Sequence, residues 1–509
     1  MTLLAERPRA KPAPDLRPHA LIIGSGFGGL AAAARLGARG YRTTVLERLD
    51  RPGGRAIVYQ QDGFRFDGGP TIITAPHLLD ELFGVCGRRR EDYVTLAPLD
   101  PFYRMIFSDG ETFDAHGDKD RARAEIARLS PKDLPGYDRF MAHSEAIYRY
   151  GFEELAHIPF GDVAEMARVT PELLRLGSLN SVHGLVSRYL KDERLRIAYS
   201  FHPLFVGGNP FKATAMYCLI SYLERAGGVH FVMGGTGALV QALVRLIGEQ
   251  GGAVRCNADV AEILVEGGAA VGVRLAGGET IRADVVVSNA DAAVTFNQLL
   301  PKGAPGRWDD AKVARGRYSM GVFVWHFGVN RRYEDVPHHT ILLGPRYRGL
   351  IDDIFDHKVL ADDFSLYIHR PTATDPSLAP PGCDAFYALS PVPHLGSGTD
   401  WAAMAEPYRR RIEKALEERL LPGLSQAVVT SHVATPGTFA ADFRAHQGAA
   451  FGLEALLTQS AWFRPHNKAD RVANLYLVGA GTHPGAGVPG VLSSARVLDQ
   501  VCPHAAALR

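Results

Sequence analysis

A glycine-rich turn near the start of the chain limits the folds that are open to it. Residues 19–23, HALII, predict a short buried strand, and Gly24, Gly26 and Gly29 then fit the spacing GxGxxG. An alanine-rich stretch at 30–40, LAAAARLGARG, predicts a helix, and RTTVLE at 42–47 predicts a second strand that ends on Glu47. Strand, glycine turn, helix, strand and acid in this order are typical of a Rossmann-like dinucleotide-binding unit.

Each residue of this unit has a physical task. Gly24 permits the tight turn, Gly26 lets the backbone approach a diphosphate, and Gly29 lets the helix pack closely on the strand. The helix N-terminus attracts phosphate groups. Glu47, about 20 residues beyond the glycines, is placed to accept hydrogen bonds from ribose hydroxyls. FAD and NAD share this arrangement, so the turn alone leaves the choice between them open.

Length, charge and cysteine content narrow the class of protein. At 509 residues the chain is too long for one simple core, so we expect two or more lobes. Lys and Arg total 56 against 55 Asp and Glu, which argues against the basic surface that nucleic-acid binding needs. The five scattered cysteines include no CxxC pair and favour a reducing cytosol. No apolar run reaches the roughly 18 residues of a spanning helix, so any membrane contact is expected to be peripheral.

Two further glycine turns favour FAD over NAD. PGGR places Gly54 and Arg55 shortly after Glu47, and DGGPT at 67–71 contains Gly69, Pro70 and Thr71. The chain here resembles glutathione-reductase-like flavoproteins, in which a GG segment follows the FAD diphosphate and the second turn lies near the isoalloxazine ring. Arg55 would offer a forked donor to the diphosphate. The alternatives are an ordinary Pro-Gly-Gly turn with an exposed arginine and a plain hairpin corner.

Two later segments complete the expected cofactor site. Residues 234–289 read as a helix, a strand and a hairpin meander, and the same resemblance implies that the Val260 backbone faces adenine. A nicotinamide site is unsupported, because no acid at the right spacing follows GGTGAL at 234–239. Near the C-terminus a strand, a glycine turn and a helix would set backbone amides beside the flavin's pyrimidine edge. The residues expected there are Gly479, Gly481, Thr482, His483 and Val488. Ala480 stands where broader relatives carry an acid, which leaves the ribityl contacts open.

The expected fold class is α/β, with a Rossmann-like FAD-binding domain that is discontinuous in the chain. We assign residues 18–95, 228–300 and 466–502 to this domain and residues 1–17 to a flexible tail. Residues 96–227 and 301–465 form an inserted, mixed α+β domain that binds substrate and associates with the membrane. Its stretches ELLRLGSL and YRRRIEKALEERLL read as helices, and GVFVWHFGV and DAFYALSPV read as strands.

The inserted segments carry the most specific resemblance. DPFYR (100–104), SFHPLFVGGNPF (200–211), HHTILLGPRY (338–347), FSLYIHRPTATDPSLAP (364–380), YALSPVPHLG (387–396) and LTQSAWFRPHN (457–467) occur in this order. Together with YLVGAGTHPGAGVPGV they closely resemble the bacterial-type phytoene desaturases, from about residue 20 to 500. The resemblance implies an FAD-dependent enzyme that desaturates phytoene stepwise through phytofluene, zeta-carotene and neurosporene, and often to lycopene. It also implies work on the cytoplasmic face of the membrane, with quinone or oxygen as electron acceptor. Whether the chain forms a homo-oligomer is left open.

The group that takes the proton in such a reaction is not evident from the sequence. The catalytic candidates are Glu165 and Arg168, which are three residues apart on an expected helix; family members have a similar acid and arginine that would flank the channel. The alternative is a surface ion pair at helical spacing. The histidines in family-like segments show no metal-ligand spacing, so no metal is expected. They are His202, His338, His339, His394, His466 and His483.

Three other functions stay open. One is another carotenoid desaturase or isomerase on the same scaffold, of the hydroxy- or methoxy-neurosporene type. The second is a flavin amine oxidase, whose polar substrate would need an aromatic cage. The third is a prenyl-protein escort, a binding module without a working flavin, against which the intact glycine turns and Glu47 argue.

Overall fold

A five-stranded parallel sheet forms the base of the cofactor side of the molecule. The computed structural model describes residues 15–303 and 306–508, so the expected tail at 1–17 lies mostly outside the described residues. The strand order is β19-β13-β1-β2-β9. The strands are β1 (His19–Ile23), β2 (Arg42–Leu46), β9 (Ala253–Arg255), β13 (Val285–Ser288) and β19 (Leu475–Leu477). Their order brings together segments from the first, middle and last parts of the chain.

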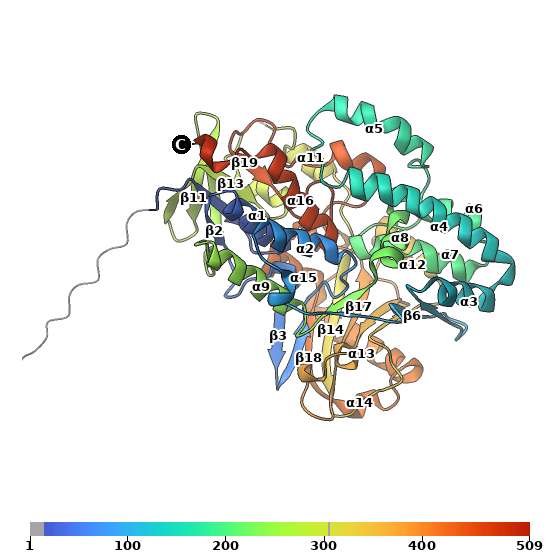
Figure 1. Ribbon diagram of the computed structural model, residues 1–509. Coiled ribbons are helices and arrows are strands. Elements are labelled where there is room, and N and C mark those ends of the chain that lie inside the picture. Colours follow the sequence, from blue (N-terminus) through green and yellow to red (C-terminus); the bar gives the residue numbers. More distant parts are fainter. Residues whose placement is uncertain (1–14, 304–305, 509) are drawn as a thin grey trace, which may run out of the picture.

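Both faces of this sheet are covered, which explains its apolar strands. Ala20 and Ile22 of β1 pack against helices, whereas Leu21 and Ile23 pack against an antiparallel meander, since successive side chains of a strand alternate between faces. The helices are α1 (Phe27–Ala38), α2 (Pro76–Val85), α9 (Thr236–Glu249) and α16 (Val488–Val501). The meander consists of β10 (Val260–Glu266), β11 (Ala269–Leu275) and β12 (Thr280–Arg282). This part occupies the upper left of Figure 1.

A seven-stranded mixed sheet forms the second lobe, and its order is β18-β14-β17-β16-β15-β6-β7. Its strands are β6 (Tyr103–Ile106), β7 (Thr112–Ala115), β14 (Gly321–Val329), β15 (His339–Leu342), β16 (Leu366–His369), β17 (Asp384–Val392) and β18 (Val428–Ala434). β14 and β17 are the two strands expected from GVFVWHFGV and DAFYALSPV, and they pair along nine residues. The parallel pairing of β15 with β6 joins the two inserted segments in one sheet.

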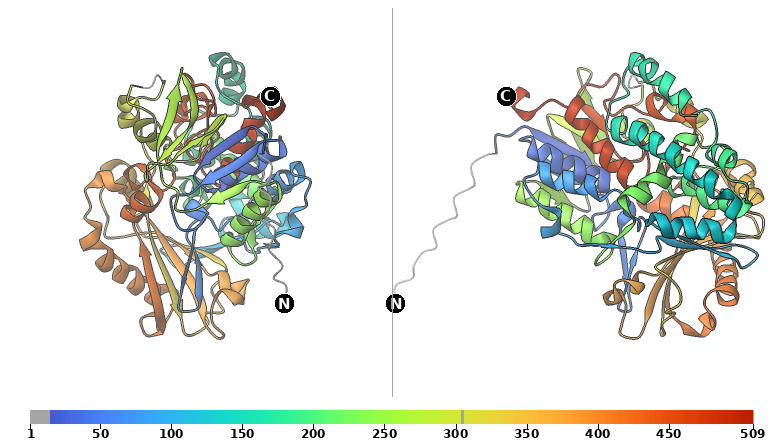
Figure 2. Two further views of the ribbon diagram at one scale, coloured as in Figure 1. Left: turned by 90° about the vertical axis from the view of Figure 1, so that its left-hand side faces the viewer. Right: turned by 45° about the vertical axis from the view of Figure 1, so that its right-hand side comes forward.

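The remaining helices fall into two groups along the chain, and Figures 1 and 2 show their arrangement. One group consists of α3 (Lys119–Leu129), α4 (Leu134–Tyr148), α5 (Val163–Arg175), α6 (Val182–Tyr189), α7 (Glu193–Ser200) and α8 (Leu219–Gly227). The others are α10 (Ala292–Val294), α11 (Asp310–Arg315), α12 (Tyr347–Asp352), α13 (Trp401–Arg419), α14 (Leu424–Ala427) and α15 (Pro436–Phe443). Two small antiparallel sheets complete the fold: a hairpin of β3 (Val58–Gln61) and β4 (Phe64–Asp67), and a long-range pair of β5 (Leu96–Pro98) with β8 (His230–Val232).

Two helix boundaries differ from those expected, and capping explains both. The helix expected within ELLRLGSL ends at Arg175, and Gly177 just beyond it takes a left-handed φ of +85°. The helix expected at 408–421 begins earlier, at Trp401, because the Asp400 side chain accepts hydrogen bonds from the amides of Ala402 and Ala403.

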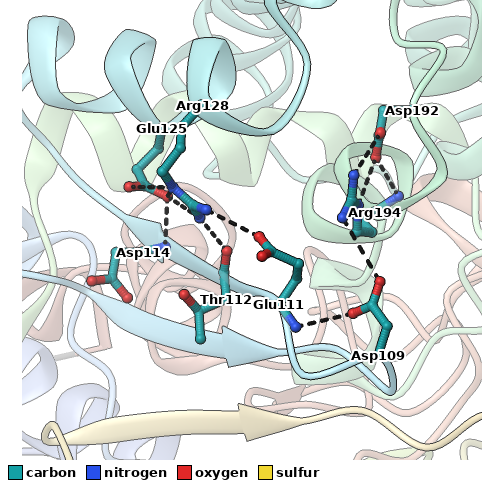
Figure 3. A network of polar contacts seen from close by, with 8 residues as sticks. All are labelled: Asp109, Glu111, Thr112, Asp114, Glu125, Arg128, Asp192 and Arg194. Carbon is teal, nitrogen blue, oxygen red and sulfur yellow. Dashed lines mark hydrogen bonds and ion pairs between the residues drawn. The ribbon is translucent and has the colours of Figure 1, made fainter.

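A polar network holds α3 against the hairpin of β6 and β7 (Figure 3). Arg128 of α3 donates to the Thr112 carbonyl and lies 3.0 Å from carboxylate oxygens of both Glu111 and Glu125. Arg194 of α7 lies 3.7 Å from Asp109 at the same hairpin. The network fixes α3 and α7 to the β6–β7 end of the sheet, and Tyr103 lies on β6.

Within residues 15–303 and 306–508, none of the helices combines the length and the apolar content needed to cross a bilayer.

Candidate functional site

A single large cavity of about 550 Å³ extends from the glycine turn of the parallel sheet to the seven-stranded sheet. Most of the residues expected to bind the cofactor line it: Gly24, Gly26, Glu47, Gly54, Arg55, Gly69, Pro70, Thr71, Val260, Gly479, His483 and Val488. Gly29, Gly481 and Thr482 do not line it. Residues that are hundreds of positions apart in sequence therefore share one wall.

The first glycine turn has the conformation that its spacing predicts. Gly24 has a left-handed φ of +88°, and α1 begins after Gly26 without a side-chain cap. The amides of the first helical turn are therefore free to bind an anion. A Cβ atom on Gly29 would lie 2.1 Å from the Gly24 carbonyl oxygen, so Gly29 serves helix packing from behind the wall.

Arg55 is the cavity residue whose charge most needs a partner. It lines the cavity, its Nε is buried, and no hydrogen-bond acceptor in the described chain reaches that atom. Burial lowers the pKa of the Arg55 guanidinium, and the negative charge of Asp291 opposes that shift. A half-buried guanidinium with an unpartnered Nε calls for an anion, and a dinucleotide diphosphate at the nearby helix N-terminus would supply one.

Glu47 is held in a fixed position at the end of β2. One of its oxygens accepts from the Ser25 amide at 3.0 Å and from the Ser25 hydroxyl at 2.5 Å, and the other accepts from the Leu49 amide at 3.0 Å. The carboxylate lines the cavity, where its remaining acceptor capacity suits ribose hydroxyls.

Two tyrosines that sequence reasoning missed enclose the second glycine turn. The Thr71 hydroxyl lies 2.8 Å from the Tyr367 hydroxyl and 3.1 Å from that of Tyr387, which also donates to the Gly69 carbonyl at 3.3 Å. The tyrosines come from β16 and β17 and line the cavity. The alternation of FSLYIH and DAFYAL is a signal that they share one face of a sheet.

The C-terminal turn divides into cavity-lining and packing residues. The His483 Nε2 donates to the Leu155 carbonyl at 2.9 Å, which leaves its Nδ1 as an acceptor, and burial lowers the pKa of this imidazole to about 4. Thr482 turns away and donates to the Pro465 carbonyl at 2.6 Å. A Cβ atom on Gly481 would lie 2.8 Å from the Ala292 side chain, so this glycine permits close packing. The Ala480 carbonyl accepts from the buried Arg464 at 2.9 Å.

Glu165 and Arg168 lie apart from this wall. Their side chains on α5 are 40% and 58% exposed and pair with each other at 2.9 Å. Neither lines the cavity, although Met166 between them does. The geometry is that of the surface ion pair considered as the alternative, and the catalytic role of the pair stays a prediction.

The histidines show one grouping that sequence spacing did not reveal. His339 and His369 are opposite each other on β15 and β16, and His338 adjoins them, so one nitrogen from each lies within 4.8 Å of the others. Such a group is within reach of a common metal ion. His338 and His369 already share an Nε2 to Nε2 contact of 3.1 Å, and burial lowers the pKa of His338 to about 3. A hydrogen bond between neutral imidazoles accounts for that contact.

The far part of the cavity is apolar. Its wall includes Phe152, Phe160, Leu173, Leu204, Phe205, Leu219, Leu223, Leu389 and Phe451. A surface of this kind binds hydrocarbon by shape and burial, without hydrogen bonds.

Comparison with known proteins identifies a flavoprotein family and, within it, enzymes that act on a hydrocarbon. The family model described as flavin containing amine oxidoreductase matches residues 27–497. The neurosporene-forming phytoene desaturase of Cereibacter sphaeroides is 50% identical over 503 residues, which cover 98% of this chain and 97% of that protein. The lycopene-forming phytoene desaturase of Pseudescherichia vulneris is 50% identical over 477 residues, with 94% and 97% covered.

Solved structures show the same fold at low identity. An oxidoreductase from Methanosarcina mazei has a TM-score of 0.63 at 20% identity and covers 95% of this chain and 100% of its own. Putrescine oxidase bound to putrescine has a TM-score of 0.63 at 18% identity and covers 96% and 100%. The expected α/β class with a Rossmann-like FAD domain is thus confirmed, and the uncapped α1 and the Arg55 Nε, which has no partner among the described residues, fit FAD as the cofactor. The chain belongs to the flavin containing amine oxidoreductases and, within them, to the bacterial-type phytoene desaturases.

Proposed function

We propose that this protein is the phytoene desaturase of its host, converting phytoene through phytofluene and zeta-carotene to neurosporene, with lycopene as a further product. The chain is an oxidoreductase that acts on CH–CH groups of carotenes with FAD. The observation that carries the proposal is a single cavity that joins the cofactor segments to an apolar wall.

The residues of the cofactor half of the cavity would bind FAD and orient it. The free amides of α1 and the Arg55 guanidinium would hold the diphosphate, Glu47 the ribose hydroxyls, and the Val260 backbone the adenine. The turn from Gly479 to Val488 would contact the flavin's pyrimidine edge. Bound FAD supplies the hydride acceptor of the reaction.

The residues of the apolar half place the substrate and exclude water. A polyene offers no hydrogen-bonding groups, so leucine and phenylalanine side chains must set its position by contact alone. Accurate placement of one allylic carbon contributes much of the rate, because a misplacement of about 1 Å costs about 100-fold. Successive desaturations follow when the polyene slides along the same cavity wall.

Three exposed apolar side chains near the cavity support binding to the cytoplasmic face of a membrane. Val163 and Leu174 of α5 are 59% and 48% exposed, and Leu179 just beyond the helix is 74% exposed. The same helix lines the cavity with Met166 and Leu173. α5 would thus lie on the lipid surface and pass the carotene inward. Quinone or oxygen is the proposed final electron acceptor.

Purified protein with FAD and phytoene-containing liposomes tests this function, first under air and then with added quinone. We expect coloured products, whose absorbance and chromatography give the number of desaturations. Unchanged phytoene, with FAD bound and liposomes engaged, would contradict the proposal. Peroxide release from an amine would instead indicate an amine oxidase.

A further inference from the structure

One carboxylate faces the cavity from the inserted segment 96–227. α8 contributes Leu219, Ile220, Leu223 and Glu224 to the cavity wall. The other lining carboxylates of the described chain come from the cofactor segments or from α15, and they are Glu47, Asp259, Asp291 and Asp442. Glu224 therefore brings a negative charge among the side chains that hold the hydrocarbon.

α8 runs beside the segment that follows the second glycine turn. A Cβ atom on Gly227, at the end of α8, would lie 2.5 Å from the Thr74 carbonyl oxygen. Thr71, Ile72 and Thr74 also line the cavity. Glu224 is consequently fixed near the turn that the family resemblance places next to the flavin ring.

The two oxygens of Glu224 have different surroundings. The residue is 4% exposed, and its Oε2 accepts from the Tyr103 hydroxyl at 3.2 Å and lies 3.3 Å from the His202 Nε2. Its Oε1 is buried, and no donor of the described chain contacts it. Leaving a buried acceptor unpaired costs about 1–3 kcal/mol of stability. The unpartnered Oε1 is therefore available to accept a proton or a hydrogen bond from a bound molecule.

A second, smaller cavity lies behind Glu224. It has a volume of about 30 Å³, which suits one water molecule. Glu224 lines both cavities, and Tyr103, His116 and His202 line the smaller one. The His116 Nδ1 lies 2.6 Å from Asp100, whose side chain is 46% exposed. A route of polar groups thus leads from Glu224 to the protein surface.

We propose that Glu224 accepts the proton that each desaturation releases and stabilises the positive charge on the polyene, and that the smaller cavity conducts the proton to His116 and solvent. This proposal rests on the desaturase function. One allylic C–H bond breaks, and its electron pair leaves as hydride to the FAD oxidant. The neighbouring C–H bond then breaks, its electron pair forms the new C=C bond, and the proton forms an O–H bond at the Glu224 Oε1. The proton then passes to water in the smaller cavity, and the carboxylate is restored for the next step.

Tyr103 and His202 act as positioning residues in this scheme. Their contacts with Oε2 fix the carboxylate, while Oε1 has no donor in the described chain and is free to accept the proton. A neutral imidazole such as His483 would attract a cation less strongly than a carboxylate does.

The test compares Glu224→Gln with Glu224→Asp and a matched control. Glu454→Gln is that control, because Glu454 is also a buried carboxylate whose Oε1 has no partner in the described chain. Its Oε2 pairs with Arg317, and the residue does not line the cavity. The first readout is binding of a phytoene-length tertiary amine, cationic at neutral pH, to holoprotein on phosphatidylcholine vesicles. The second is conversion of phytoene at equal FAD content.

We expect Glu224→Gln to weaken amine binding on the order of 100-fold, because the substitution removes the buried negative charge that would pair with the ammonium group. Conversion should fall by about 10² to 10⁴. Glu224→Asp should retain amine binding within about tenfold, and Glu454→Gln should leave both readouts near wild type. Glu224→Gln that folds, keeps FAD and converts phytoene within about threefold of wild type overturns the proposal. If wild type itself converts no carotene, the desaturase function fails instead.

The exit route has its own variant. His116→Gln should slow conversion by about tenfold and leave amine binding unchanged, since it alters proton release without touching the charge at Glu224. Unchanged conversion in this variant would overturn the route through His116.

Discussion

Arg55 shows how one half-buried charge would tie the protein to its cofactor. Its Nε finds no acceptor in the described chain, although the residue lies at the wall beside Gly26 and Gly54. Asp291 is the nearby negative charge that acts on the guanidinium, and a bound diphosphate would supply the missing hydrogen-bond acceptor. His483 shows the opposite case, a buried group that stays neutral because its surroundings disfavour charge.

Replacing Arg55 with methionine should weaken FAD binding by about 10- to 100-fold, the effect of losing charged hydrogen bonds to a diphosphate. Flavin fluorescence released on dilution measures this affinity. Arg51→Met is the matched control, because Arg51 pairs with Asp50 and is 48% exposed. An Arg55→Met protein that retains FAD as tightly as wild type would contradict the diphosphate role.

His483 predicts a loss of stability in acid. Burial lowers its pKa from 6.5 to about 4, so between these values the unfolded state binds a proton that the folded state does not. Stability should therefore fall as pH drops through this window, by up to about 3 kcal/mol from this residue. Urea unfolding at pH 7 and pH 4.5 measures the change. His483→Gln, which keeps a donor for the Leu155 carbonyl, should reduce that fall, and an identical pH dependence would refute the assignment.

At the scale of elements, α5 has one face that lines the cavity and another that is exposed. Its buried face meets the cavity through Met166 and Leu173, while Val163 and Leu174 face outward. Glu165 and Arg168 belong to the outward side, as their mutual ion pair shows. A helix with this division suits a surface between water and lipid.

Serine at Val163, Leu174 and Leu179 together should weaken sedimentation with anionic vesicles by at least about tenfold, because three apolar side chains leave the lipid. Conversion of phytoene dispersed in detergent should change less. Val359 and Val429, which are 53% and 51% exposed elsewhere, provide the control substitutions to serine. Equal vesicle binding by the two sets would show that α5 is not the contact.

At the scale of the whole molecule, the cavity depends on segments that meet only in the folded state. Local spacing predicted Gly24 and Glu47, which lie in one strand-helix-strand unit, and Arg55, which follows that unit closely in the chain. Glu224 and Tyr367 could not be predicted in this way, because their relation to the wall depends on how α8 and β16 pack against residues 69–74. Periodicity gives the face of an element but not the neighbour that it meets.

FAD should therefore stabilise the entire fold. At a free concentration of about 100 times its Kd, we expect about 2.7 kcal/mol of added stability. Thermal unfolding of apoprotein and holoprotein measures this difference, and the shift should grow with the FAD concentration. Arg55→Met should lower the shift at a given concentration. A melting temperature independent of FAD would mean that the cofactor segments do not form one site.

The order of strands in the parallel sheet also governs when the cofactor cavity can be completed during synthesis. β1 is made early, but its sheet also needs β13 and finally β19, and the turn at 479–491 follows every other wall segment in the chain. A ribosome releases the N-terminus first, so the first glycine turn must wait while both inserted segments are translated. A nascent chain stalled before β19 therefore lacks part of the cavity wall, and we expect it to retain FAD poorly.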